Sequence, residues 1–494
     1  MNNKKLIDQI DLKDKKVIIR LDLNVPMKDG KITNNKRIVS ALPTIKKAYE
    51  SGAKVILLSH LGRVKEESDK ATKTLKPIAK ELTKLLDGKE VIFVPEAVGK
   101  EVKEVVKAMK SGEIVLLENT RWEDLNNKAE STNNPKLAKY WASLGEVFIN
   151  DAFGTSHRSH ASNVGIASNI AESGIGYLVQ KEIEMLSKAI NHPAKPAVAI
   201  IGGAKVSDKI KTIDNLLKHV DRVIIGGGMA FTFWKAQGLS VGKSLVELDQ
   251  VELAKEYLKK YQDRLILPID AALSVEFKNS KPIYNIYNPL EIPENYMGLD
   301  IGPKSIQLFK KELADAKTVI WNGPLGVCEF KNYSVGTQEI AKAIGSLKDA
   351  YTVVGGGDSV AAIATLGLES EFSHISTGGG ACLAMLEGND LPGISAIQNQ
   401  GEKSRIAAEM LNPAEVKIDV DNNKKNDVDN NKKDEGSTKE LNVDKDKKED
   451  EQAKTQTIDS DSDKSDKKEE KDKEDSSNKE NDSKEQKTEV IDGK

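Results

Sequence analysis

Residues 353–364 read Val353-Val354-Gly355-Gly356-Gly357-Asp358-Ser359-Val360-Ala361-Ala362-Ile363-Ala364. The pattern predicts a buried strand, a glycine turn and the start of a helix. Glycines lack the Cβ atoms that would keep a ligand off the backbone, and the free N–H groups of such a turn attract an anion. Asp358 would repel a bare phosphate, but it suits a divalent cation lying between a carboxylate and phosphate oxygens. The stretch therefore predicts a Mg-nucleotide site; the alternative is a turn that only reverses the chain.

Composition limits the class of protein. The chain has 494 residues, of which 38% are hydrophobic and 31% charged, and its formal net charge is -3. This length allows two or three domains, and the small net charge favours neither nucleic-acid nor membrane binding. Cys328 and Cys382 form no CxxC pair and predict no disulfide framework. Because the sequence has neither a secretory signal nor an apolar run of about 20 residues, we expect a soluble, cytoplasmic protein.

Strand and helix patterns alternate along the first half. Apolar runs predict strands at residues 16–26, 54–59, 91–94, 114–117 and 147–154, and helical spacing predicts helices at residues 38–49, 75–86, 101–109 and 135–144. The polar residues 64–73 predict a mobile loop. Such alternation is typical of the α/β class, with a doubly wound, Rossmann-like parallel sheet that has helices on both faces.

The ends of these strands carry polar and basic side chains. They are Asp22, Asn24, His60, Arg63, Arg121, His157, Arg158 and His160, with Arg37 in a nearby loop. Arg20, Asp22 and Asn24 alternate, so an extended chain places them on one face. Ligands of open α/β sheets bind beyond the carboxyl ends of the strands, and several guanidinium groups there suit a small anion with phosphate and carboxylate groups. Solvated surface arginines are one alternative; a metal site is another, although the spacing is not typical of metal ligands.

The second half repeats the alternation with different chemistry. Five of its predicted strands run into glycine-rich turns, which begin at Gly202, Gly226, Asn322, Gly355 and Gly378. The first half thus gathers basic side chains and the second gathers bare backbone. We infer that one half holds a compact anion and the other admits a polyphosphate nucleotide close to its backbone.

Two lysines follow the first of these turns. If Lys205 opens a helix after Gly202-Gly203, then Lys205 and Lys209 lie on one face of it, near its N-terminus. Two familiar phosphate signatures are absent. The spacing from Gly238 to Gly242-Lys243-Ser244 is one residue short of a P-loop, and no GxGxxG opens a βαβ unit.

Two further segments complete the predicted organisation. Residues 174–190 have helical spacing without strand alternation and predict a helix that links two domains. Residues 412–494 contain no aromatic residue and are dominated by Lys, Asp, Glu, Asn and Ser, so we expect a disordered, solvated tail. The domains predicted are residues 1–174, the linker 175–190, residues 191–380, a segment 381–411 and the tail 412–494.

With these motifs in hand the chain resembles the phosphoglycerate kinases from about Val17 to Ile397. The resemblance rests on residues 20–26 (RLDLNVP), 59–63 (SHLGR), 116–121 (LLENTR), 150–158 (NDAFGTSHR), 202–209 (GGAKVSDK), 321–324 (WNGP), 355–359 (GGGDS) and 377–381 (TGGGA). It implies reversible phosphoryl transfer between 1,3-bisphosphoglycerate and Mg-ADP, giving 3-phosphoglycerate and Mg-ATP, in a monomeric glycolytic enzyme that closes about a hinge. It also implies that residues 381–411 return to the first domain.

The resemblance also implies roles for individual residues. The phosphoglycerate would be held by Asp22, Leu23, Asn24, Arg37, His60, Leu61, Gly62, Arg63, Arg121 and Arg158, with His160 nearby. The transferring phosphoryl group would contact Lys205, Arg37 and the helix N–H groups of Gly378, Gly379 and Gly380. The nucleotide would be bound by Lys205, Lys209, Glu329 at the ribose, Gly356, Gly357, Asp358 through Mg²⁺, and Ser359.

The sequence departs from the family pattern at Val64, Trp122, Cys328 and Ala384, and Cys328 is expected to loosen the adenine side of the pocket. Two other readings stay open. One is a different two-domain kinase that phosphorylates a carboxylate. The other is a non-catalytic nucleotide-binding scaffold whose tail recruits partners.

Overall fold

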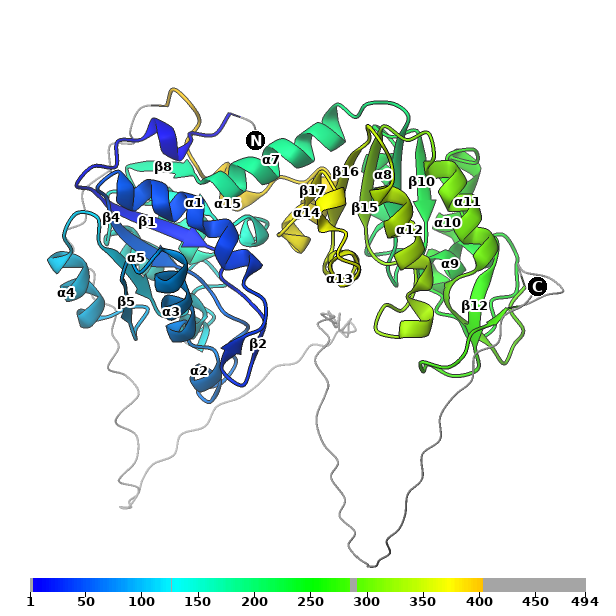
Figure 1. The fold of residues 1–494 in the computed structure, drawn as a ribbon, viewed down its shortest axis with the longest axis horizontal. Coiled ribbons are helices and arrows are strands. Elements are labelled where there is room, and N and C mark those ends of the chain that lie inside the picture. Colours follow the sequence, from blue (N-terminus) through cyan, green and yellow to red (C-terminus); the bar gives the residue numbers. More distant parts are fainter. Residues whose placement is uncertain (1–2, 126, 285–290, 403–494) are drawn as a thin grey trace, which may run out of the picture. The chain divides into compact units, whose positions relative to one another are not determined.

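The computed structural model describes residues 3–125, 127–284 and 291–402. The first of its two large sheets has the strand order β5-β6-β4-β1-β7-β8, and every neighbouring pair is parallel. Its strands are β1 (Lys16–Leu21), β4 (Lys54–Leu58), β5 (Val91–Val94), β6 (Ile114–Leu117), β7 (Val147–Asp151) and β8 (Glu172–Ile175). The prediction of an α/β fold with parallel sheets is confirmed (Figure 1).

Both faces of this sheet are buried because successive residues of each strand point to opposite sides. Ile18 joins the hydrophobic cluster that includes Trp141, whereas Ile19 joins the cluster that includes Ile45. The first cluster is covered by α4 (Lys100–Ala108) and α5 (Pro135–Ala142), and the second by α1 (Lys36–Glu50) and α3 (Lys76–Leu85). The strands accordingly read as continuous apolar runs.

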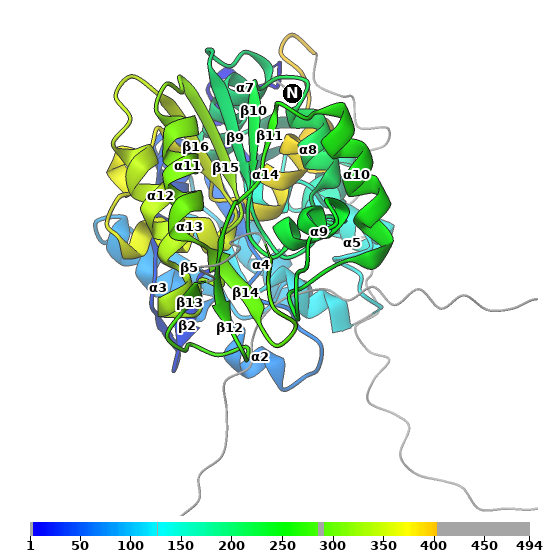
Figure 2. The same ribbon diagram turned by 90° about the vertical axis from the view of Figure 1, so that its right-hand side faces the viewer.

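The second sheet repeats this plan in the order β11-β10-β9-β15-β16-β17, again all parallel (Figure 2). Its strands are β9 (Ala197–Ile201), β10 (Arg222–Ile225), β11 (Leu265–Ile266), β15 (Thr318–Asn322), β16 (Tyr351–Gly355) and β17 (His374–Ile375). Apolar residues of α8 (Ile210–Leu216), α9 (Met229–Ala236) and α10 (Val251–Lys260) pack on one face. Those of α11 (Pro303–Leu313), α12 (Val335–Gly345) and α13 (Gly357–Thr365) pack on the other.

Two small antiparallel sheets were not predicted. Three strands form one of them in the order β13-β12-β14, with bounds β12 (Ala271–Ser274), β13 (Ile283–Tyr284) and β14 (Met297–Ile301). The other is a hairpin of β2 (Met27–Lys28) and β3 (Lys31–Ile32). The strands β2, β3 and β13 have only two residues each, which is too few for a periodic pattern to stand out in sequence.

Each large sheet reverses its strand order next to its first strand. In the first sheet β1 lies between β4 and β7, and in the second β9 lies between β10 and β15. The loops that follow β1 and β7 therefore diverge to opposite sides of the sheet, as do those that follow β9 and β15. Such switch points, at the carboxyl ends of the strands, are where ligands of open α/β sheets bind.

The segment predicted to link two domains contains a strand as well as a helix. Gly174 and Ile175 belong to β8, and the helix α7 covers Tyr177–Asn191. The prediction that residues 174–190 contain no strand was wrong at its start. β8 is short, includes a glycine and lies at the sheet edge beside β7, so it shows no alternation.

Residues 64–73 were expected to form a loop but contain α2 (Asp69–Thr72), and Asp69 accepts hydrogen bonds from Lys65 N and Lys73 Nζ, at 2.7 and 2.6 Å.

The last described residues hydrogen-bond to the first sheet and to the N-terminal segment. In α15 (Pro392–Ser395), which follows α14 (Gly379–Leu386), the carbonyl of Gly393 accepts from Asn150 Nδ2 at 2.8 Å, and beyond α15 the carbonyl of Gln398 accepts from Lys5 N at 2.9 Å. Residues 403–411 of the segment predicted to return, and the whole tail predicted at 412–494, lie outside the described residues.

Shorter helical turns are η1 (Ile7–Gln9), η2 (Thr120–Leu125), η3 (Phe153–Thr155), η4 (Ala161–Gly165), α6 (Ile166–Ser168), η5 (Leu248–Gln250), η6 (Lys331–Tyr333) and η7 (Glu369–Glu371).

Candidate active site

The carboxyl edge of the first sheet brings together side chains that are far apart in sequence. Asp22 follows β1, His60 follows β4, Arg121 follows β6 and Arg158 follows β7. Because these strands are neighbours and parallel, their carboxyl ends meet at one edge. The predicted basic cluster is therefore placed at the switch point of this sheet.

Arg37 is held by an ion pair with Asp22. Its Nη1 donates to Oδ1 and Oδ2 of Asp22, at 2.9 and 3.1 Å, and to the carbonyl of Asn24, at 3.1 Å. Its Nη2 donates to the carbonyl of Thr377 at 3.2 Å. Arg37 lies in the first turn of α1 rather than in the loop predicted for it, because the helix begins at Lys36, two residues before its predicted start. The guanidinium is thus fixed at the rim of the cluster, with its side chain about one-third exposed (33%).

The loops after β1 and β4 are hydrogen-bonded to each other. Leu23 N donates to Ser59 Oγ at 2.9 Å, and Gly62 N donates to Asn24 Oδ1 at 2.9 Å. Leu61 N donates to Asn119 Oδ1 at 3.1 Å. Four predicted site residues, Leu23, Asn24, Leu61 and Gly62, are therefore locked into one backbone framework.

The remaining basic residues differ in exposure. Arg121 is buried, and its Nη1 donates to Asp124 Oδ2 at 2.8 Å. Arg63 and Arg158 are exposed, and Arg158 Nε donates to His157 Nε2 at 3.0 Å. Arg20, predicted to share a cleft face with Asp22, is instead buried, and its Nε donates to Ser162 Oγ at 2.7 Å.

His60 and His160 of the cluster are electrically neutral at neutral pH. Burial and the charges of Arg20 and Arg121 hold the pKa of His60 well below its ordinary value. Burial, Arg121 and Arg20 lower the pKa of His160 to about 3. The positive charge of the cluster therefore comes from the arginines, and the imidazoles act as uncharged polar groups.

Glu130, a buried acid beneath this cluster, was missed from the sequence. One oxygen of its fully buried carboxylate lies 3.9 Å from Arg20 Nη2 and 3.7 Å from His160 Nδ1. It accepts hydrogen bonds from Ser162 N at 2.9 Å and Ser162 Oγ at 2.5 Å. Burial raises the pKa of Glu130 and the charge of Arg20 lowers it. Its neighbours in sequence are mostly polar and show no helix or strand periodicity, so the sequence did not indicate that Glu130 is buried.

In the second sheet the glycine turns pack directly on one another. A Cβ at Gly202 would overlap the carbonyl oxygen of Pro324, and a Cβ at Gly227 would lie 2.6 Å from the backbone N of Gly203. Gly227 also has a φ of +69°. Only glycine allows the turns after β9, β10 and β15 to approach this closely.

These turns line a cavity of about 500 Å³. It is bounded by Gly203, Gly227 and Leu325, by Glu329 and Asp358, and by residues of the antiparallel strands β12 and β14. Its volume is within the range of small-molecule sites. Lys209 Nζ donates to Asn322 Oδ1 at 2.8 Å beside the same turns. Cys328 does not line this cavity; its thiol lies 3.5 Å from Thr337 Oγ1.

The glycine motif at residues 353–364 forms the strand, turn and helix that its sequence predicts. β16 ends at Gly355, and α13 begins at Gly357 with Asp358 in its first turn. The hydroxyl of Ser359 is buried and has no hydrogen-bond partner among the described residues. Desolvation and the charge of Glu329 raise the pKa of Asp358, and Lys209 lowers it. A helix N-terminus, the carboxylate of Asp358 and the unpaired hydroxyl of Ser359 thus lie together at the start of α13.

A second glycine turn opens α14. Gly378 precedes the helix, and a Cβ built at Gly379 would meet no atom within 4 Å. A Cβ at Gly380 would lie 2.8 Å from the His157 ring. Gly379 thus leaves open space at the N-terminus of the helix.

The predicted position of Lys205 on a helix is wrong. The helix α8 begins at Ile210, so Lys205 and Lys209 both lie in the preceding turns. Lys205 is exposed, whereas Lys209 is partly buried. Gly203 has a φ of +121°, and the chain turns there before it can enter the helix.

Comparison with known proteins agrees with this geometry. The sequence profile described as phosphoglycerate kinase matches residues 7–389. The chain belongs to the phosphoglycerate kinase family. A phosphoglycerate kinase of Enterococcus faecalis (strain ATCC 700802 / V583) is 56% identical over 397 residues, covering 80% of this chain and 100% of that protein. One of Staphylococcus aureus (strain bovine RF122 / ET3-1) is 55% identical over the same length and with the same coverage.

Solved structures give the same result. The phosphoglycerate kinase from Coxiella burnetii has a TM-score of 0.70 and 41% identity, covering 80% of this chain and 98% of that one. The enzyme from Pyrococcus horikoshii OT3 has a TM-score of 0.68 and 34% identity, with 79% and 97% coverage. The chain is therefore an enzyme of glycolysis, a phosphotransferase with a carboxyl group as acceptor. Within the described ranges, no helix is both long and apolar enough to span a membrane.

Proposed function

We propose that the chain catalyses reversible phosphoryl transfer between 1,3-bisphosphoglycerate and Mg-ADP, giving 3-phosphoglycerate and Mg-ATP. The observation that carries this proposal is the pairing of two complementary sites. One is an arginine-rich cluster at the switch point of the first sheet, and the other is a glycine-lined cavity at the switch point of the second. The family assignment supports the same reaction.

The basic cluster would bind the phosphoglycerate. Arg121, Arg158 and Arg63 supply positive charge for its phosphate, and His60 supplies an uncharged donor. Asp22 and Asn24 would bind its hydroxyl group and its neighbouring oxygen atoms. The backbone hydrogen bonds of Leu61 and Gly62 hold the loop that carries these contacts. Asp22 also orients Arg37. This combination of arginines with neutral and acidic polar groups suits a small anion that carries both a phosphate and a carboxylate group.

The glycine-lined cavity would bind the nucleotide. Lys209 and the turn at Gly356 and Gly357 would contact the phosphates, and Glu329 would reach the ribose. The unpaired hydroxyl of Ser359 is available to a phosphate oxygen. The open space at Gly379 leaves room for the transferring group next to the N–H groups of α14.

The residues present fit a magnesium ion that arrives with the nucleotide. Asp358 offers one carboxylate in the lining of the cavity, and the described residues contain no cluster of three acidic, histidine or cysteine side chains that could hold a metal alone. Mg²⁺ is commonly held by one or two carboxylates together with phosphate oxygens. Bound there, the ion would neutralise phosphate charge.

The chemistry would be direct, in-line transfer. In the direction of ATP synthesis, the bond between phosphorus and the carboxyl oxygen of the acyl phosphate breaks, and a bond from phosphorus to a terminal oxygen of ADP forms. Arg37 and Lys205 would stabilise the negative charge of the transferring group from opposite sides. A carboxylate acceptor is ionised at neutral pH, so no general base is needed in the reverse direction.

We further propose that the two halves close over the substrates as a monomer in the cytoplasm. In this proposal residues 1–174 and 191–380 form the two domains, residues 175–190 form the hinge, and residues 381–411 return to the first domain. Closure would exclude water, which would otherwise hydrolyse the nucleotide. Stiffening the hinge should reduce turnover more than nucleotide affinity; equal losses in both would contradict the hinge.

The acceptor can be tested with a panel of carboxylates. ATP consumption should require Mg²⁺ and 3-phosphoglycerate, and acetate or aspartate at the same concentration should not replace 3-phosphoglycerate, because neither carries a phosphate for the arginine cluster. Activity with acetate or aspartate alone would instead support a different carboxylate kinase. No turnover with any of them would favour the non-catalytic nucleotide-binding reading.

A further inference from the structure

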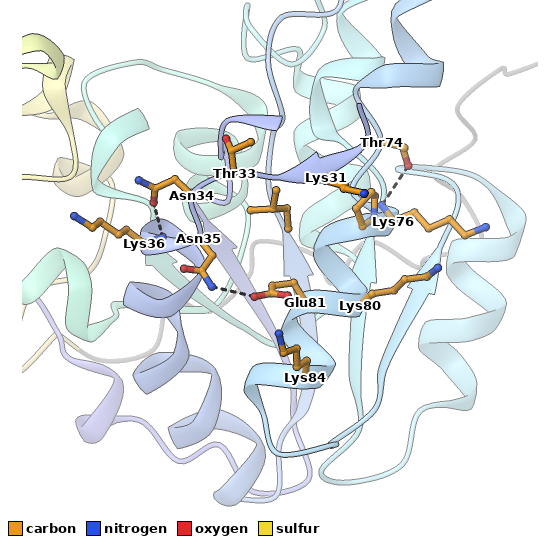
Figure 3. Close-up of a pocket in the computed structure, with 13 residues that line it drawn as sticks. Lys31, Thr33, Asn34, Asn35, Lys36, Thr74, Lys76, Lys80, Glu81 and Lys84 are labelled. Atoms are coloured by element: carbon orange, nitrogen blue, oxygen red, sulfur yellow. Dashed lines mark hydrogen bonds between the residues drawn. The ribbon is translucent and has the colours of Figure 1, made fainter. Parts of the chain in front are cut away.

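A second cavity, of about 910 Å³, lies between the hairpin β2–β3, the start of α1 and the outer face of α3 (Figure 3). It is lined by five lysines and one glutamate: Lys31, Lys36, Lys76, Lys80, Lys84 and Glu81. None of the residues that the proposed reaction uses lines it. The cavity is therefore a feature separate from the candidate active site.

The lysines of α3 form a regular stripe. Lys76, Lys80 and Lys84 are each four residues apart, so they lie along one exposed face of the helix, while Ile78 and Leu82 face the core. An α-helix rises about 1.5 Å per residue, which separates successive lysines of the stripe by about 6 Å along the helix axis. Like charges at this spacing destabilise a helix.

No ion pair in the described part of the chain neutralises Lys76, Lys80 or Lys84, or Lys31 on the opposite side, whereas Lys36 is paired with Glu369. The single carboxylate of the cavity, Glu81, accepts a hydrogen bond from Asn35 Nδ2 at 3.0 Å (Figure 3). Positive charge therefore gathers here in a chain whose net charge is -3.

We propose that this cavity is a docking groove for an extended, acidic segment of a partner protein. In an extended chain, alternate side chains point to the same side and lie about 6.6 Å apart. A segment with Asp or Glu at every second position would therefore place its carboxylates opposite Lys76, Lys80 and Lys84. Lys31 would flank the segment from the β2–β3 hairpin, which packs against α3.

The lining residues favour a peptide over other polyanions. Proteins that bind single-stranded nucleic acids stack bases on aromatic side chains, and this cavity has none. A compact phosphate is best held by converging donors such as an arginine fork, whereas these lysines are spread over nine residues of one helix. Thr33, Asn34 and Thr74 add short polar side chains along the groove.

Fluorescence anisotropy of the full chain with a labelled decapeptide of alternating Asp and Ser tests the proposal. The comparison peptide has Asn in place of every Asp. The test variant combines Lys76→Gln, Lys80→Gln and Lys84→Gln. The control variant combines Lys255→Gln, Lys259→Gln and Lys260→Gln on α10, which removes the same charge from a helix outside the groove.

We expect saturable 1:1 binding of the acidic peptide that weakens with salt, no binding of the Asn peptide, and a loss of about tenfold or more in the α3 variant only. Both variants should keep the melting temperature and the 3-phosphoglycerate-dependent activity, because all six lysines are exposed and lie outside the candidate active site. Equal weakening in both variants, or absence of saturable binding, would overturn the proposal. Inorganic polyphosphate binding while the acidic peptide does not would overturn the assignment to a peptide.

Discussion

The carboxylate of Glu182, on α7, accepts hydrogen bonds from the backbone N–H and the hydroxyl of Thr377, at 2.7 and 2.8 Å. His374 Nε2 donates to its other oxygen at 2.8 Å. Glu182 is fully buried, and Thr377 directly precedes the glycine turn that opens α14. The carbonyl of Thr377 also accepts from Arg37. One buried carboxylate thus ties the proposed hinge helix to the turn that would face the transferring group.

Glu182→Gln is expected to lower turnover about tenfold or more while leaving the affinity for ATP nearly unchanged. A glutamine can accept at one oxygen only, so its NH₂ group would face either Thr377 N or His374. The loss should also lower the free energy of unfolding by about 1–3 kcal/mol. Steady-state kinetics and urea denaturation measure the two effects. Glu184→Gln, on the exposed side of α7, is the matched control. Equal kinetics in the two variants would contradict the role of Glu182.

Asp22→Asn should weaken 3-phosphoglycerate binding and slow transfer. The substitution keeps the shape of the side chain but removes the charge that holds Arg37 at 2.9 Å. Charge-assisted hydrogen bonds contribute about 1.5–3 kcal/mol, so kcat/KM should fall roughly ten- to hundredfold. Asp29→Asn in the exposed β2–β3 hairpin serves as the control. A normal kcat/KM for Asp22→Asn would show that Arg37 needs no fixed orientation.

Gly379→Ala should separate catalysis from folding. Its Cβ meets no atom within 4 Å and its backbone does not have a positive φ, so the melting temperature is expected to stay unchanged. The added methyl group would occupy the space proposed for the phosphoryl group and should reduce turnover. The melting temperature and kcat, measured on the same preparation, test whether turnover falls while stability is kept. Full activity would place the transferring group elsewhere.

The neutral histidines of the cluster predict a pH dependence of stability. The pKa of His160 falls to about 3 on folding, against about 6.5 in an unfolded chain. The unfolded state therefore binds more protons between these values, and the stability present above pH 6.5 is lost as pH falls toward 3. One such histidine contributes a loss of about 2 kcal/mol between pH 7 and pH 5. His160→Gln should reduce the loss seen in urea titrations at the two pH values. An identical loss in the variant would contradict a neutral, buried His160.

The parts of the fold that the sequence predicted were those with strong apolar patterns. The strands β1, β4, β5 and β6 are continuous apolar runs because helices cover both faces of their sheet, and they stand out for that reason. The antiparallel strands β12 to β14 did not, because β13 has only two residues, both exposed, and β12 and β14 include Ala, Ser, Gly and Asp rather than a run of Val and Ile. β8 was hidden because its pattern, Glu172–Ile175, contains a serine and a glycine.

The candidate site was predictable where residue type and strand end coincide. Asp22, His60 and Arg121 each follow a recognisable strand, so their convergence could be expected from a parallel sheet. Glu130 could not be expected, because it belongs to an aperiodic loop and is buried through contacts with residues distant in sequence, among them Ser162 and Arg20. Lys205 does not lie on a helix, as had been expected, because the turns after Gly203 continue to Lys209.

The central claim, phosphoryl transfer assisted by Lys205, is tested most directly by ATP consumption that depends on 3-phosphoglycerate and Mg²⁺. The full chain should be compared with Lys205→Ala and with Lys211→Ala, an exposed lysine of α8 six positions further on. We expect activity in the full chain, a loss of about a hundredfold or more in kcat for Lys205→Ala, and little change for Lys211→Ala. Equal activity of the two variants, or no turnover that requires 3-phosphoglycerate in folded protein, would contradict the claim.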